Sequence, residues 1–259
     1  MTELLKIEWL KVKAYRTFWL LSGLFLAIVP LILWSYELIL KNSKQIAAFL
    51  GAFSFPKAWE TSAWIGSAMY PIMGILLIIF LTNENNFRTI RQNIIDGWSR
   101  DQYILAKFGV MITMALYMTL VIVASALFFG LRSGQGDPTD GMGMIWLIFV
   151  QAMDYLAVAL FLGVFMKRAG VAIAIYVMYA YVFEFFISRL IDFKVKAHMG
   201  ALLPLECTDR MIPGETKLVN ELASQGVKPF GQSTLQMIAI GYILLFCFLA
   251  YRRLKRSDL

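Results

Sequence analysis

Charged side chains are concentrated in one polar stretch, residues 82–107, which separates two apolar segments. Its arginines, Arg88, Arg91 and Arg100, could form charge-assisted hydrogen bonds with acidic groups on another protein. Such contacts would bind a partner protein and would not catalyse a reaction. The alternative is a solvated basic loop whose charges only orient the neighbouring apolar segments. The candidate partner contacts in this stretch are Glu84, Arg88, Arg91, Asp96, Ser99, Arg100 and Lys107.

Two further ionisable residues, Asp154 and Glu184, lie inside long apolar segments. Ionisable side chains at membrane depth usually face the interior of a helix bundle or a water-filled cavity. These two therefore indicate a proton or cation path, or contact with a polar part of a transported molecule. The alternative is structural: each pairs with a neighbour such as Arg189, Tyr155 or Tyr181, or lies near the membrane surface.

Other chemistries find little support in the sequence. His198 is the only histidine, and Cys207 and Cys247 are the only cysteines, so no metal-ligand spacing is present. The phosphate-binding pattern Gly-x-x-x-x-Gly-Lys-Ser/Thr is absent. Hydrolase patterns such as Gly-x-Ser-x-Gly and His-Glu-x-x-His are absent as well. We therefore expect no catalytic residues and no metal ligands in this chain.

The composition is that of a membrane protein. The 259 residues are 59% hydrophobic and 16% charged, with a mean hydropathy of +0.67, whereas soluble domains are about 25% charged. The apolar residues fall in blocks of about 20, the length that crosses a bilayer. The net charge of +7 arises from basic residues at the ends of these blocks, which is a topology signal and does not indicate a nucleic-acid partner. The expected fold class is an all-α integral membrane protein.

The apolar blocks predict six transmembrane helices in a single domain, residues 1–259. Residues 1–17 combine Trp9 with several basic residues and predict an interfacial helix lying in the headgroup region. Residues 191–232 form the longest polar region, interrupted by short apolar pieces. The predicted spans are residues 18–40, 64–81, 104–131, 144–166, 171–190 and 235–251, with a polar segment at 82–103.

The distribution of lysine and arginine predicts the orientation. Six spans put both termini on one side of the membrane. That side carries the basic residues of 1–17, 82–107, 167–170 and 252–256, whereas the other side has longer loops with nearly as many acids as bases. Short loops dense in Lys and Arg mark the cytoplasm. Both termini and the 82–103 segment are therefore expected to be cytoplasmic, and residues 191–232 extracytoplasmic.

This layout resembles the membrane subunit of the type-2 class of ABC transporters, the permeases of bacterial exporters. In that family the segment between spans two and three often reads Glu, then Thr-x-Arg, then Ser-Arg and a downstream Lys. The chain departs from the pattern at Arg88, where the family often has Gly, and at residues 96–98, where it often has Pro ahead of the Ser-Arg pair. The residues that stand in the family's order are Glu84, Thr89, Arg91, Ser99, Arg100 and Lys107.

The resemblance implies a permease subunit that moves a hydrophobic or amphipathic cargo across the bacterial inner membrane. It implies two permease subunits, identical or related, on two ABC ATPase subunits, with residues 82–103 as the coupling helix. It also implies that the outer region, residues 191–232, re-enters the membrane, with residues 202–205 as the expected tip; irregular backbone there must be shielded by protein or water. ATP and Mg would bind to the ATPase and not to this chain. The alternative is an ion-gradient-driven secondary transporter that uses Asp154 and Glu184. The lack of an internal repeat and of matching broken helices argues against it.

Overall fold

The computed structural model describes residues 2–42, 51–86, 99–166, 168–195, 198–213 and 230–256. Every regular element in these ranges is a helix, so the predicted all-α class is confirmed. The elements, in chain order, are α1 (Thr2–Lys13), α2 (Arg16–Asn42), α4 (Lys57–Ser67), α5 (Tyr70–Asn86), α7 (Arg100–Ser133), α8 (Gly143–Phe165), α9 (Ala169–Met178), η1 (Tyr179–Phe183), α10 (Glu184–Val195), η2 (Met199–Leu202), α11 (Pro204–Met211) and α13 (Gln232–Arg256).

Five helical segments of the described chain are long and apolar enough to cross a membrane: α2, α7, α8, the continuous helix Ala169–Val195 and α13. The region expected to form one span at residues 64–81 consists instead of two helices, α4 and α5, bent by 45° at the break between them. If this pair is counted as one span, the number of candidate spans rises to six. Pro71 lies in the first turn of α5, where proline is well accommodated because the backbone N–H there has no helical partner.

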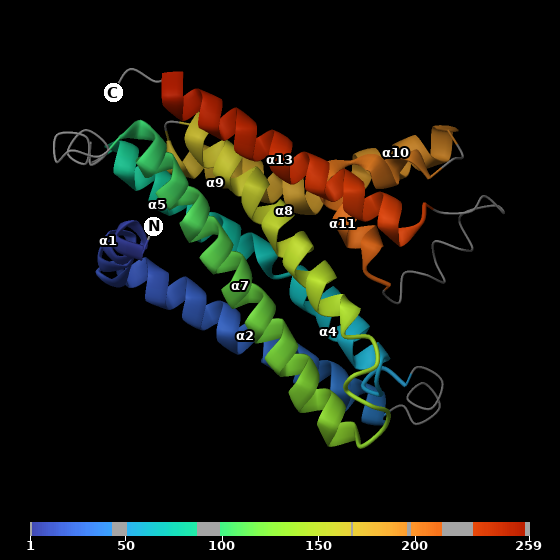
Figure 1. Ribbon diagram of the computed structural model, residues 1–259. Coiled ribbons are helices and arrows are strands. Elements are labelled where there is room, and N and C mark those ends of the chain that lie inside the picture. The colour runs from blue at the N-terminus through green and yellow to red at the C-terminus, as the bar shows by residue number, and fades with distance from the viewer. Residues whose placement is uncertain are drawn as a thin grey trace.

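α8 forms the core of the bundle. Ala152, Leu156 and Leu160 have no exposed surface, and the helix packs against α5, α7, α11 and α13 (Figure 1). By contrast, α2 and α10 expose large apolar side chains such as Leu20 and Phe186. Apolar surface of this extent is unfavourable in water, so these outward faces are suited to lipid or to another protein.

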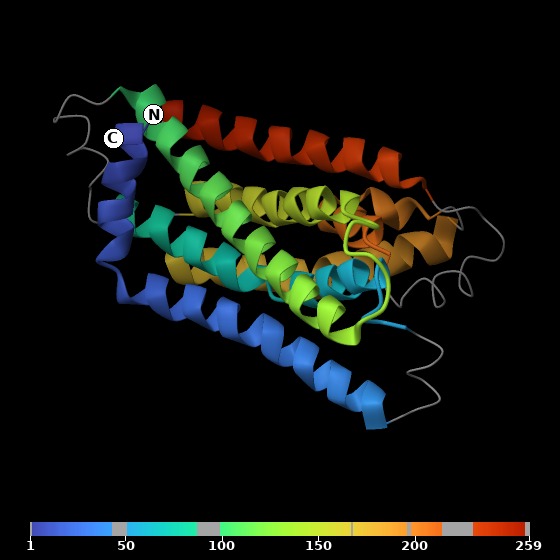
Figure 2. The same cartoon turned by 60° about the horizontal axis from the view of Figure 1, so that its bottom comes forward.

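The long helices run between two ends of the molecule (Figure 2). At the first, called here the α1 end, α1 lies crosswise beside the end of α5 and the start of α7, and α13 also ends there. At the other, the α11 end, α11 lies near the start of α13 and the end of α10. The α1 helix, near the start of the chain, and the last turns of α13 are thus at the same end of the molecule. Charged clusters are found at both ends, and they are described below.

Close helix approach depends on Gly74 of α5, which faces the ring of Tyr176 in α9. Tyr176 has no exposed surface, and its hydroxyl donates a hydrogen bond of 3.2 Å to the backbone carbonyl of Tyr155. A methyl group at position 74 would overlap this ring. The ring has no free volume to enter, because protein interiors are close-packed.

Gly74→Ala is therefore expected to destabilise the protein by about 1–3 kcal/mol through overpacking. Gly23→Ala is the matched control, since Gly23 also lies in an apolar helix but a methyl group there meets nothing within 4 Å. Thermal unfolding of the two purified variants in detergent measures the difference. Equal midpoints for the two variants would show that the α5–α9 contact is loose.

Candidate functional site

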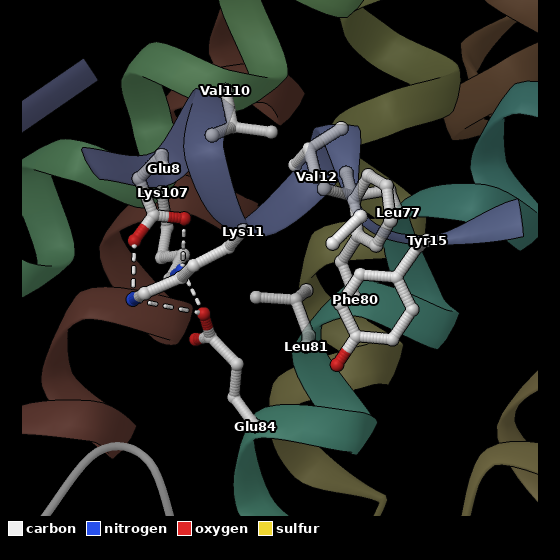
Figure 3. A pocket seen from close by; sticks show the side chains of 11 residues that line it. Glu8, Lys11, Val12, Tyr15, Leu77, Phe80, Leu81, Glu84, Lys107 and Val110 are labelled. Carbon is white, nitrogen blue, oxygen red and sulfur yellow. Dashed lines mark hydrogen bonds and ion pairs between the residues drawn. The ribbon is translucent and has the colours of Figure 1, made fainter. Parts of the chain in front are cut away.

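Four charged side chains meet at the α1 end and form the four-charge cluster: Glu8, Lys11, Glu84 and Lys107 (Figure 3). The Lys107 Nζ atom lies 2.5 Å from Glu8 Oε2 and 2.6 Å from Glu84 Oε1. The Lys11 Nζ atom lies 3.0 Å from Glu8 Oε1 and 3.5 Å from Glu84 Oε1. Lys107 is only 3% exposed. The two acids and two bases balance in charge, as a buried group of ions requires.

The cluster joins three helices that are remote in sequence. Glu8 and Lys11 lie on α1, Glu84 near the end of α5, and Lys107 near the start of α7. The Tyr103 hydroxyl, also on α7, donates a hydrogen bond of 2.6 Å to Glu84 Oε2. A cavity of ≈ 370 Å³ lies beside the charges. The cluster thus holds α1 against both helices that flank residues 87–98.

The electrostatics favour the charged forms of both α1 residues. Burial opposes ionisation of Glu8, but attraction and hydrogen bonding from Lys107 and Lys11 outweigh it and lower the pKa of this carboxyl group. Burial likewise works against the charge of Lys11, and attraction from Glu84 and Glu8 raises the pKa of the amine above its usual value. At neutral pH both residues are therefore ionised and take part in the ion pairs.

The candidate partner contacts divide into two groups. Ser99 and Arg100 lie at the surface, where the Ser99 side chain caps α7 by accepting a hydrogen bond from the Gln102 backbone N–H. The Arg100 Nη1 atom donates to the Lys255 carbonyl at 2.9 Å and so links α7 to α13. Glu84 and Lys107 have little exposed surface and take part in the four-charge cluster. Arg88, Arg91 and Asp96 lie outside the described residues.

Sequence reasoning missed Glu8 and Lys11 as site residues. Their spacing of three residues, which places them on one face of a helix, was the signal available. Nothing in the sequence pointed to their partners, since Lys107 is 99 residues from Glu8.

The second group, the carboxyl cluster, lies toward the α11 end and consists of Asp154, Glu184, Glu206 and Asp209. Glu184 Oε1 accepts hydrogen bonds from the backbone N–H groups of Leu205 and Glu206, at 2.6 and 2.9 Å, and thereby holds the start of α11. Asp154 Oδ2 accepts one from the Thr208 hydroxyl at 3.3 Å. Glu184 is 2% exposed and Asp154 is fully buried. The structure thus brings Asp154 and Glu184 to the same short helix, α11.

The expected neighbours of Asp154 and Glu184 have other roles. The Tyr155 hydroxyl donates to Asp209 at 3.0 Å, and that of Tyr181 donates to the Ala68 carbonyl at 2.6 Å. The Arg189 guanidinium lies over the Phe185 ring, 5.2 Å from its centroid. Sequence reasoning did not single out Glu206 or Asp209 either, because both lie in the polar region 191–232, where acidic residues are ordinary.

Asp209 and Arg210 join α11 to neighbouring helices. Asp209 Oδ1 accepts a hydrogen bond of 2.8 Å from Gln151 Nε2. Burial raises the pKa of Asp209 to about 7, with repulsion from Glu206 acting in the same direction. Arg210 pairs with Glu206 at 2.6 Å and with Asp192 at 2.7 Å. Among the described residues, no group of three or more His, Cys, Asp or Glu side chains is arranged to hold a metal ion.

Comparison with protein families identifies the chain. The profile of the family described as ABC-2 family transporter protein matches residues 4–188. The chain belongs to this family. It is thus an ABC-2 type permease and a multi-pass membrane protein, as the sequence predicted. A comparison with curated proteins finds no match.

Membership of the ABC-2 family bears on the two clusters and on the alternative function. The matched region includes all four residues of the four-charge cluster and also Asp154 and Glu184, whereas α11 and α13 lie beyond it. ABC-2 permeases are membrane transport subunits and are generally not catalytic themselves. The family does not favour an ion-gradient-driven carrier.

Proposed function

We propose that this ABC-2 permease is the membrane subunit of an ATP-driven exporter of the bacterial inner membrane. It pairs with a second permease subunit and moves a hydrophobic or amphipathic cargo, powered by a separate ABC ATPase. ATP and Mg bind to that ATPase, in keeping with the absence of a phosphate-binding pattern from the sequence. The observation that carries the proposal, beyond the family, is the four-charge cluster.

The cluster supports a mechanical role for residues 82–103. A subunit without a nucleotide site receives the work of ATP hydrolysis as movement at a contact surface. The segment begins within the last turns of α5 and ends within the first turn of α7. Glu84 and Lys107 join these two helices directly, at 2.6 Å. A displacement of the segment by the ATPase would therefore move α5 and α7 together. It would also move α1, which Glu8 and Lys11 join to them. In this proposal residues 82–103 are the coupling segment.

The orientation that follows places the α1 end in the cytoplasm and the α11 end outside. Both termini and the coupling segment are then on the side of the ATPase, in agreement with the excess of basic residues there. The α1 helix exposes Trp9 and Leu10, at 49% and 64%, and suits the membrane surface. α11 and η2 form the extracytoplasmic re-entrant region, whose irregular backbone is shielded by α8 and α13.

Charge reversal at the coupling segment tests the proposal. The chain is purified with the ATPase encoded beside it, and ATPase activity is measured for the wild type, Arg91→Glu and Arg100→Glu. Each reversal is expected to lower cargo- or lipid-stimulated ATPase activity by about 10- to 100-fold, since a charge-assisted hydrogen bond contributes about 1.5–3 kcal/mol. Arg132→Glu is the matched control, because Arg132 lies at the opposite end of α7 and is exposed.

Two results would overturn the coupling proposal. One is the absence of any ATPase that co-purifies with the chain. The other is a complex that forms but in which Arg91→Glu and Arg100→Glu behave like Arg132→Glu. In either case the four-charge cluster would be a packing feature only.

A further inference from the structure

A cavity of ≈ 560 Å³ lies between α2, α4, α8, α10 and α11. Its volume is within the range of small-molecule sites, about 300–1,000 Å³. Side chains from both the membrane-spanning helices and α11 line it, so a molecule inside would contact the moving bundle and the re-entrant region together. Its lining includes acidic and aromatic side chains, and the two kinds restrict the ligand in different ways.

The acidic residues of the lining are Glu184, Glu206 and Asp209. Glu184 is 2% exposed, and its Oε2 atom accepts no hydrogen bond of normal geometry from the described residues. The Tyr179 hydroxyl lies close enough to interact with this carboxyl group but does not satisfy that atom. A buried carboxylate oxygen without a donor is unfavourable, so this atom marks a position for a positively charged or hydrogen-bonding ligand.

Acidic side chains outnumber basic side chains in and around the cavity. Two bases also line the cavity. Arg210 is engaged by Glu206 and Asp192, and the Arg189 guanidinium lies over the Phe185 ring. Among the described residues, only neutral donors form hydrogen bonds with Glu184 and Asp209. The same holds for Asp154, which accepts from the Thr208 hydroxyl. Among the described residues, these three carboxyl groups thus have no ion pair with a base. Buried charges are normally paired.

Aromatic side chains also line the cavity. Tyr36 of α2, Trp64 of α4, and Tyr181 and Phe185 of the α9–α10 helix contribute to its lining. Aromatic faces attract cations through their quadrupole and also offer apolar surface. The Arg189 guanidinium already lies over the Phe185 ring, which shows that this ring accepts a cation in the folded chain.

We propose that this cavity binds an amphipathic organic cation, with its charge near Glu184 and Asp209 and its apolar part against the aromatic side chains. An inorganic cation would use the carboxyl groups but not the rings, and a neutral lipid would use the rings but leave the acids unpaired. The assignment of this ligand as cargo rests on the proposed permease function, whereas binding itself is a property of the isolated chain.

A pair of ions with the same shape and opposite charge tests the proposal. Binding of radiolabelled tetraphenylphosphonium and of tetraphenylborate is measured on the purified full-length chain in an uncharged detergent, with the saturable component taken as specific. We expect saturable binding of the phosphonium and none of the borate. Asp209→Asn and Glu184→Gln should each weaken phosphonium binding about tenfold, since each removes one carboxylate near the bound charge. Phe185→Ala should weaken it about threefold.

Asp140→Asn serves as the control, because Asp140 is an exposed acid in the loop between α7 and α8 and does not line the cavity. Its phosphonium affinity should equal that of the wild type. Size-exclusion profiles and unfolding midpoints establish that each variant is folded. Equal binding of the two ions, or phosphonium binding unchanged in both Asp209→Asn and Glu184→Gln, would overturn the cation site. Since the assay contains no ATPase, such a result would leave the permease proposal standing, and loss of ATPase coupling would not affect the binding result.

Discussion

Lys107→Met is expected to lower the free energy of unfolding by about 3–5 kcal/mol, the usual effect of removing one partner from a buried ion pair. The substitution keeps the length of the side chain but leaves the carboxylates of Glu8 and Glu84 facing the single amine of Lys11. Glu8 is 3% exposed, so water does not replace the lost partner. Chemical or thermal unfolding of the purified variant measures the loss.

A double substitution separates charge imbalance from lost packing. Glu8→Leu combined with Lys107→Met removes one acid and one base, and it leaves Glu84 with Lys11 and with the Tyr103 hydroxyl. Because the remaining charges are balanced, the double variant should recover most of the stability that the single variant loses. A double variant as unstable as Lys107→Met would show that the Lys107 side chain matters for its packing and not for its charge.

The class and the family could be predicted from the sequence because the signals that carry them are local. The length and placement of the apolar blocks and the bases at their ends indicate a membrane protein whatever the packing, and the family match agrees with the resemblance. The block expected at residues 144–166 corresponds to α8, Gly143–Phe165, since no helix-breaking residue interrupts it. These inferences needed no knowledge of which helices touch.

The break between α4 and α5 shows where local signals become ambiguous. Pro30 and Pro71 both lie in apolar blocks, yet Pro30 is inside the uninterrupted helix α2 whereas Pro71 lies in the first turn of α5. Proline is compatible with both positions. The choice between them depends on neighbouring helices that can shield the free backbone groups, and this information is not in the sequence around either residue.

Neither charged cluster could be assembled from the sequence. The sequence predicts an interfacial helix at residues 1–17 and a partner contact at Lys107, but neither pattern links Glu8 to Lys107, because the approach of α1 to α7 is set by side-chain packing over the whole bundle. In the same way, the sequence places the residues of α11 in the polar region 191–232. Its contacts with α8 and α10 bring Thr208 to Asp154 and the Leu205 N–H to Glu184, which local pattern does not encode.

Glu184→Ala is expected to lower the free energy of unfolding by about 2–6 kcal/mol, because two buried backbone N–H groups of α11 lose their acceptor and each contributes about 1–3 kcal/mol. The loss should be local. Cys207 is fully buried one residue beyond Glu206, so loosening of α11 should increase its labelling by a maleimide about tenfold or more. Labelling is measured in a Cys247→Ser background, in which Cys207 is the only cysteine.

Glu184→Gln is the control that divides the two roles of this side chain. Glutamine keeps an oxygen that can accept from the Leu205 and Glu206 N–H groups but has no charge. Slow labelling of Cys207 in Glu184→Gln and fast labelling in Glu184→Ala would show that the oxygen, not the charge, holds α11 in place. Fast labelling in both would mean that the charge itself stabilises α11. In the first case the negative charge of Glu184 is not needed to hold α11, and binding of a cation in the cavity would explain why a charged residue occupies this buried position.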